Sequence, residues 1–302
     1  MTSHPLADIR KSLSLTRSIG PLPASLQALV MAAILKEGKK SILWIVENSD
    51  EMYQAQENLS SFLPISEISI YPAPDTRPYQ DDSLSKEIAA RRVAVPADLL
   101  ASRQRIIVAP FDALVFPVIP LEELNASTIL LETEKDIDRD ELSRRLILMG
   151  YTREALVDDI GQFSVRGSIM DIFSPGMEEP VRIDLWGDTI TSIRSFHLTT
   201  QRSGKDLVSA TILPACEILL DTNHVKNARP FLRRMKDPAM PSLIADIEQG
   251  IYPPGIDTYL SLFYEQPATI FDYLGHTSVI AAPDASIIDL WWENLSERYS
   301  HA

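Results

Sequence analysis

The side chains that most often perform catalysis or hold metal ions are few and dispersed in this sequence of 302 residues. The five histidines are His4, His197, His224, His276 and His301. None of them has a carboxylate or a cysteine at the spacing typical of a metal site. His197 falls in a predicted strand, where a structural role is commoner than general-base catalysis, and Cys216 follows a Pro-Ala pair and is typical of a buried small residue. We therefore expect no catalytic residue, no metal site and no cofactor.

A phosphate-binding loop would be expected just before the first helix if the chain bound nucleotides as helicases do. Such a loop needs glycine N–H groups and a lysine to hold the phosphates. Residues 18–27 contain one glycine, two prolines that lack an N–H, and no lysine. Nucleotide binding in the usual mode is therefore not expected.

Arginine and tryptophan provide the main functional signal. In residues 181–186, strand alternation puts Val181, Ile183 and Leu185 on one face and leaves Arg182 and Trp186 on the other. Exposed Arg and Trp are the residue types that dominate protein-interface hot spots.

Further arginines accompany this pair. Arg166 alternates with apolar neighbours and is predicted on the same face, and Arg194 and Arg202 follow in the next strand and loop. An equally weighted alternative is that Trp186 covers the end of the core while the arginines pair with Asp171 and Asp184. DNA contact by these arginines is a third interpretation, which the acidic composition disfavours.

The elements that would position these residues fall into three parts. Residues 18–117 alternate helix and strand, with helices at 23–36, 50–62 (capped by Asp50) and from 85, and strands at 41–46, 68–71 and 105–109. This pattern predicts a parallel α/β sheet.

From residue 128 the pattern changes to a helix at 138–149 and short strands at 163–173, 181–186 and 189–196. These predict an inserted α+β domain with an antiparallel sheet. The remainder is helical, with a late strand at 278–281. We expect domains at 1–118, 119–214 and 215–302.

The bulk composition limits the function. The formal net charge is −14, and an acidic chain repels DNA unless its basic residues gather on one face, so little or no direct DNA binding is expected. One cysteine, no secretory signal and no apolar stretch of about 18 residues predict a cytoplasmic protein that does not span a membrane.

Several motifs resemble two related bacterial repair families. Residues 150–153, 161–173, 180–188, 193–196, 201–203 and 214–217 follow the order seen in the excision repair protein UvrB and in the N-terminal UvrB-homology module of the transcription-repair coupling factor (Mfd). Residues 72–79, 250–259, 262–265 and 269–274 resemble the coupling factor in particular. The absent phosphate loop, and the lack of room after Asp82 for the DNA-clamping hairpin of UvrB, also favour the coupling factor.

The resemblance implies a degenerate helicase-like (RecA-like, UvrB-type) domain carrying an inserted domain that binds UvrA, the damage-scanning ATPase. By position the family's binding arginines fall on Arg166 and Arg182 and its exposed aromatic on Trp186; Arg194 and Arg202 are supporting candidates. The chain would be a non-catalytic recruitment module of transcription-coupled nucleotide excision repair. RNA polymerase would be reached only indirectly through modules absent here, and other domains of the full-length translocase would mask the UvrA-binding face. An ATP- or DNA-binding helicase-like domain, or an inert scaffold, are the alternatives.

Overall fold

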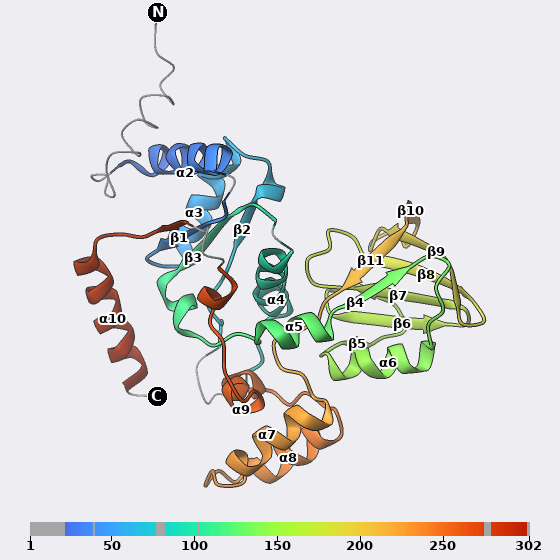
Figure 1. Ribbon diagram of the computed structural model, residues 1–302. Coiled ribbons are helices and arrows are strands. Elements are labelled where there is room, and N and C mark those ends of the chain that lie inside the picture. Colours follow the sequence, from blue (N-terminus) through green and yellow to red (C-terminus); the bar gives the residue numbers. More distant parts are fainter. Residues whose placement is uncertain (1–21, 39, 77–81, 102, 275–278, 301–302) are drawn as a thin grey trace, which may run out of the picture. The chain divides into compact units, whose positions relative to one another are not determined.

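The computed structural model describes residues 22–38, 40–76, 82–101, 103–274 and 279–300 (Figure 1). The chain forms two compact units. The first comprises Met1–Ala73, Asp98–Phe116 and Phe271–Ala302, and the second comprises Pro74–Ala97 and Pro117–Ile270. In no described segment is a helix both long and apolar enough to cross a membrane.

The first unit is built on a parallel sheet. Its strands are β1 (Ile42–Val46), β2 (Ile68–Ile70), β3 (Ile106–Pro110) and β12 (Val279–Ala281), and its helices are α2 (Ala24–Gly38), α3 (Ser49–Ser60) and α10 (Ala285–Ser300), with short 3-10 turns at Ile65–Glu67, Phe111–Val115 and Ile270–Tyr273. The order is β12-β1-β3-β2, and every neighbouring pair is parallel (Figure 1). The late strand therefore joins the sheet beside β1, where Ile42 pairs with Val279.

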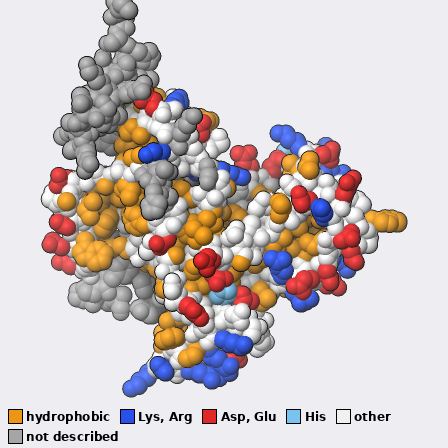
Figure 2. All heavy atoms as spheres, in the orientation of Figure 1, with side chains coloured by type: hydrophobic (Ala, Val, Ile, Leu, Met, Phe, Trp, Pro, Cys, Tyr) orange, Lys and Arg blue, Asp and Glu red, His pale blue; other side chains and the backbone are white. Residues whose placement is uncertain are grey.

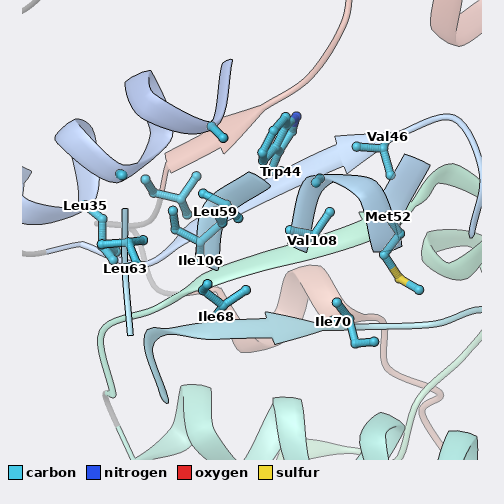
Figure 3. Packing of buried hydrophobic residues seen from close by; sticks show 14 residues of the cluster. Leu35, Trp44, Val46, Met52, Leu59, Leu63, Ile68, Ile70, Ile106 and Val108 are labelled. Carbon is cyan, nitrogen blue, oxygen red and sulfur yellow. The ribbon is translucent and has the colours of Figure 1, made fainter. Parts of the chain in front are cut away.

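One face of this sheet packs against α2 and α3. The shared core contains Leu35 from α2, Trp44 from β1, Met52 and Leu59 from α3, and Ile106 from β3, all at most 7% exposed (Figure 3). Each such aliphatic side chain contributes about 1.5–3 kcal/mol when it is fully buried. The continuous apolar run that predicted a covered strand at β1 is therefore buried, and β1 and β3 are buried at every position.

The expected cap of α3 is wrong by two residues. Asn48, not Asp50, is the N-cap: its side-chain oxygen accepts a hydrogen bond from the N–H of Glu51 at 3.0 Å. Asp50 lies in the first turn, where its charge still favours the positive end of the helix dipole.

The second unit carries the inserted sheet. Its strands are β4 (Ile129–Glu132), β5 (Thr152–Arg153), β6 (Gln162–Arg166), β7 (Ile169–Phe173), β8 (Val181–Trp186), β9 (Thr189–Phe196), β10 (Ser203–Leu207) and β11 (Ser209–Ile212). Its helices are α5 (Leu121–Ser127), α6 (Arg139–Leu148), α7 (Thr222–Leu232), α8 (Met240–Glu248) and α9 (Leu260–Phe263), with a 3-10 turn at Ile256–Tyr259; α4 (Lys86–Leu100) belongs mostly to this unit.

The main sheet of this unit has the order β10-β9-β8-β7-β6-β5. All neighbours are antiparallel except β5 and β6. A separate two-stranded sheet pairs β4 with β11. The predicted combination of a parallel sheet and an antiparallel sheet in an α/β protein is therefore confirmed.

Candidate functional site

The six-stranded sheet has an apolar inner face and a polar outer face. On β8, Val181, Ile183 and Leu185 are buried while Arg182, Asp184 and Trp186 alternate with them. The cross-strand register extends the outer face over the neighbouring strands, which contribute Ser164, Arg166, Ile169, Asp171, Ser192 and Arg194. The outer face is therefore the surface on which the predicted site residues can meet.

A buried carboxylate organises the middle of this face. Asp171 on β7 is 0% exposed and lies opposite Arg182 on β8. The Arg182 guanidinium donates from Nε to Oδ1 at 2.7 Å and from Nη2 to Oδ2 at 3.0 Å, which is a bidentate ion pair. Arg166 on β6 donates a further bond to Oδ2. Asp171 thus binds both arginines together.

Arg182 is largely enclosed by these contacts. Its side chain is 14% exposed, against 43% for Arg166. Its Nη1 donates to the carbonyl oxygen of Gln201 at 3.1 Å, and its Cζ lies 4.7 Å from the centre of the Phe196 ring. The hydrogen bonds to Asp171 raise the pKa of Arg182, so its charge is fixed.

Arg194 on β9 lies directly opposite Arg182, an arrangement of like charges that would destabilise a sheet by itself. Asp184 offsets the repulsion, because it forms an ion pair with Arg194 and accepts a hydrogen bond from Ser192 at 2.6 Å. Charges of both signs therefore alternate across the face.

The two ends of the outer face differ. At one end a small apolar cluster of Val157, Phe173 and Phe196 covers it. At the other end, next to the hairpin turns, Trp186 is 83% exposed and Ile169 is partly exposed. We call this second region, formed by Arg166, Ile169, Asp184, Trp186 and Arg194, the open end.

Two tight turns border the open end. Gly167-Ser168 joins β6 to β7 and Gly187-Asp188 joins β8 to β9; the glycines have φ of +60° and +62°, as type II′ hairpins require of their first central residue. A side chain at either glycine would be strained, and the short turns fix the register that puts Trp186 on the outer face.

The first residue of α6 and the segment before it brace both turns. Arg139 donates to the carbonyl of Gly167 at 2.8 Å, and the Thr189 hydroxyl donates to Asp136 at 2.6 Å. The N–H of Ile137 also donates to the carbonyl of Asp188 at 2.8 Å. The open end is therefore a rigid surface, which reduces the entropy lost when a partner binds.

Four of the five predicted site residues come together on the outer face, and one does not. Arg166, Arg182, Trp186 and Arg194 share it, whereas Arg202 is exposed in the loop before β10. The arginines pair with Asp171 and Asp184, as the structural alternative anticipated, but Trp186 does not cover the core. Asp171 was not singled out as a site residue, although its alternation with buried Met170 and Ile172 marks it as an outer-face carboxylate.

His224 has two carboxylate neighbours in the structure, although its sequence spacing did not predict a metal site. His224 is 6% exposed, and its Nδ1 lies 2.6 Å from Asp221 and its Nε2 3.2 Å from Glu123. The carboxylates approach opposite ring nitrogens, so they hold the imidazole rather than a shared ion. No trio of His, Cys, Asp or Glu side chains in the described parts of the chain is placed to hold a metal.

Cys216 is a free thiol whose Sγ lies 3.2 Å from the carbonyl oxygen of Ile218. Burial raises the pKa of this thiol to about 12, so it is protonated at neutral pH. Residues 18–27, where a phosphate-binding loop would be expected, lie partly outside the described residues.

Comparisons with known proteins find relatives of this part of the chain. Residues 129–217, which include β4 to β11, match the UvrB interaction domain family. The transcription-repair-coupling factor of Bacillus subtilis (strain 168) is 30% identical over 92% of this chain and 25% of its own length. That of Myxococcus xanthus is 32% identical over 76% of this chain and 21% of its own length, and that of Staphylococcus haemolyticus (strain JCSC1435) is 26% identical over 87% and 24%.

The chain spans about a quarter of the length of these relatives. The family match covers the whole outer face, and the relatives align with both units. Residues 129–217 are therefore similar to UvrB interaction domains, and the chain is similar to part of the transcription-repair-coupling factors.

Proposed function

We propose that this chain is a non-catalytic recruitment module of transcription-coupled nucleotide excision repair, and that it docks UvrA through the open end. The observation that carries the proposal is the exposure of Trp186, which is 83% exposed on the same sheet face as Arg166. An indole held in water costs free energy that a partner's pocket would recover. The match of residues 129–217 to the UvrB interaction domain family supports UvrA as that partner.

The arginines would have different roles. Arg166 and Arg194 have exposed fractions of 43% and 35%, so their guanidinium groups can reach a partner while they remain bound to Asp171 and Asp184. Arg182 is too enclosed to supply much contact area. We assign it to positioning, because it fixes Asp171, which in turn orients Arg166. Arg202 would contribute at the edge of the contact.

The rest of the chain would frame this docking domain. We propose that residues 1–118 form a degenerate RecA-like domain of the UvrB type, that residues 119–214 are the inserted UvrA-binding domain, and that residues 215–302 complete the first domain. The missing lysine and the two prolines in residues 18–27 support a domain without ATP hydrolysis. RNA polymerase and masking of the docking face would involve other parts of a longer protein.

Isothermal titration calorimetry of the chain with UvrA tests the proposal. Trp186→Ala and Arg166→Ala should each weaken binding by about 1–3 kcal/mol, roughly 5- to 150-fold, the range for truncated hot spots. Val208→Ala is the matched control, because Val208 is 79% exposed and apolar but lies outside the open end. Unchanged affinity in both test variants would remove the site assignment, and magnesium-dependent ATP turnover by the chain would favour a helicase-like enzyme instead.

A further inference from the structure

One surface of the second unit concentrates positive charge in a chain of net charge −14. From Thr222 to Lys236 the sequence contains five basic residues and no acidic one. The segment is α7 and the turn that follows it. Figure 2 shows Lys and Arg side chains gathered at the end of the α7–α8 pair. We call Lys226, Arg233, Arg234 and Lys236 together with Phe231 the basic tip.

The basic tip is available to a partner. All four of its cations are exposed, and Phe231 is 51% exposed although it is aromatic. Lys226 lies on α7, and Arg233, Arg234 and Lys236 lie in the turn that follows its last residue, Leu232. The buried stripe of α7 carries Val225, Ala228 and Leu232.

These cations are not used to stabilise the fold by ion pairing. Among the described carboxylates, none forms an ion pair with Arg233, Arg234 or Lys236, whereas Arg229 pairs with Glu248 at 2.9 Å. Asp237, the nearest carboxylate in sequence, instead accepts the N–H of Ala239 at 2.8 Å. Arg229 in the last turn already opposes the negative end of the helix dipole. The remaining cations need another explanation.

A groove adjoins the tip. It has a volume of about 430 Å³, and its lining combines an apolar floor that includes Met235, Met240 and Ile244 with Arg233, Asp237 and Glu248. Two carboxylates, Asp237 and Glu248, belong to this lining. They could accept hydrogen bonds from the amino groups of a nucleic-acid base, while the outward cations meet phosphates.

We propose that the basic tip binds single-stranded DNA, with its arginines and lysines on the phosphates and Phe231 stacked on an unpaired base. Exposed cations interspersed with an aromatic ring are the combination that tracks a single strand. Because the rest of the chain is acidic and repels phosphates, the DNA contact should be limited to the basic tip. The net charge predicted little or no direct DNA binding. Under this proposal that prediction still holds for the surface outside the basic tip.

Fluorescence anisotropy with a labelled oligothymidylate of about 20 nucleotides tests the proposal, since single-strand-binding domains cover ~4–16 nucleotides. If three phosphates are contacted, affinity should fall roughly 20-fold between 50 and 200 mM salt. The triple variant Arg233→Ala, Arg234→Ala and Lys236→Ala should bind at least about tenfold more weakly at low salt and lose most of the salt dependence.

The matched control removes the same charge elsewhere on the second unit. Lys135, Arg153 and Lys205 are exposed cations outside the tip, and replacing all three by alanine should change affinity less than about twofold. Phe231→Ala should weaken binding about fivefold or more at every salt concentration, because stacking is not screened. Thermal unfolding checks that each variant folds.

Three results would overturn the proposal. The first is equal loss in the tip triple and the control triple, which would indicate only long-range attraction. The second is competition by duplex DNA as strong as by the single strand. The third is equal competition by polyglutamate, which would indicate an acidic protein partner. UvrA binding should be unchanged in the tip variants, so the outcome is independent of the open end.

Discussion

Arg182→Ala separates the positioning role proposed for this residue from direct contact with a partner. The substitution removes two hydrogen bonds to Asp171, one to the Gln201 carbonyl and the stacking of the guanidinium on Phe196. Asp171 is fully buried and would keep only Arg166. The main consequence should therefore be a loss of stability in the second unit.

The expected size follows from the burial of the pair. Removing one partner of a buried ion pair costs about 3–5 kcal/mol, because a desolvated charge is left behind. Arg166 still neutralises part of that charge, so we expect about 3 kcal/mol. Trp186→Ala should change stability by less than about 0.5 kcal/mol, because the indole is already in water.

Urea unfolding followed by circular dichroism measures this difference. The chain has two compact units, so each transition is fitted separately. With a slope of ~1–3 kcal/mol per molar urea, a loss of about 3 kcal/mol lowers the midpoint by roughly 1–3 M. Arg202→Ala is the control, since it removes an exposed arginine from the neighbouring loop and should leave the midpoint nearly unchanged.

A double variant sharpens the test. Adding Asp171→Asn to Arg182→Ala removes the buried charge itself and should restore about 1 kcal/mol or more. If Arg182→Ala shifts the midpoint no further than Arg202→Ala, or if the double variant is as unstable as the single one, the reasoning about Asp171 is refuted.

Three further predictions concern the second unit. Gly150→Ala should cost roughly 2 kcal/mol or more in urea unfolding, because its Cβ would lie 2.5 Å from the Cys216 sulfur at a φ of +89°; adding Cys216→Ala should recover all but the backbone strain of about 1 kcal/mol. The Cys216 thiol, whose pKa burial raises to about 12, should resist a disulfide reagent at pH 8 in the native chain and react fully in urea. Burial also raises the pKa of the Asp257 carboxyl above 3.8, so the native state binds the carboxyl proton more tightly than the unfolded state does. The free energy of unfolding should therefore fall as the pH rises through the raised pKa. Asp257→Asn should flatten this pH dependence in urea midpoints measured between about pH 4 and 7.

Local patterns in the sequence predicted the side-chain directions of β8, but not the whole inserted sheet, because residues 163–173, expected as one strand, form the two strands β6 and β7. The alternation in residues 181–186 predicts which side chains of β8 face outward, because the period of a strand is two whatever surrounds it. The continuous apolar run at β1 likewise predicts a strand covered on both faces. These inferences need no knowledge of distant residues.

Local sequence patterns could not predict how exposed each of these side chains is. Arg166 and Arg182 have the same predicted direction, but only the pairing of β7 with β8 places Asp171 against Arg182, and only β9 brings Phe196 beside it. Alternation therefore predicts the face of a side chain and not its exposed fraction. The N-cap of α3 was also not predicted correctly from local sequence. Asn48 and Asp50 are both favourable N-cap residues, and only the backbone conformation shows that Asn48 is the cap.

The position of β12 has a consequence for how the protein is made. Val279 pairs with Ile42, so the edge strand leaves the ribosome long after the strand it binds. At ~5–20 residues per second, roughly 10–50 s separate the two events. Throughout that interval β1 presents an unpaired edge to the cell while the second unit is synthesised and can fold. A chaperone that shields this edge, or a pause in translation after residue 270, should therefore change the yield of native protein.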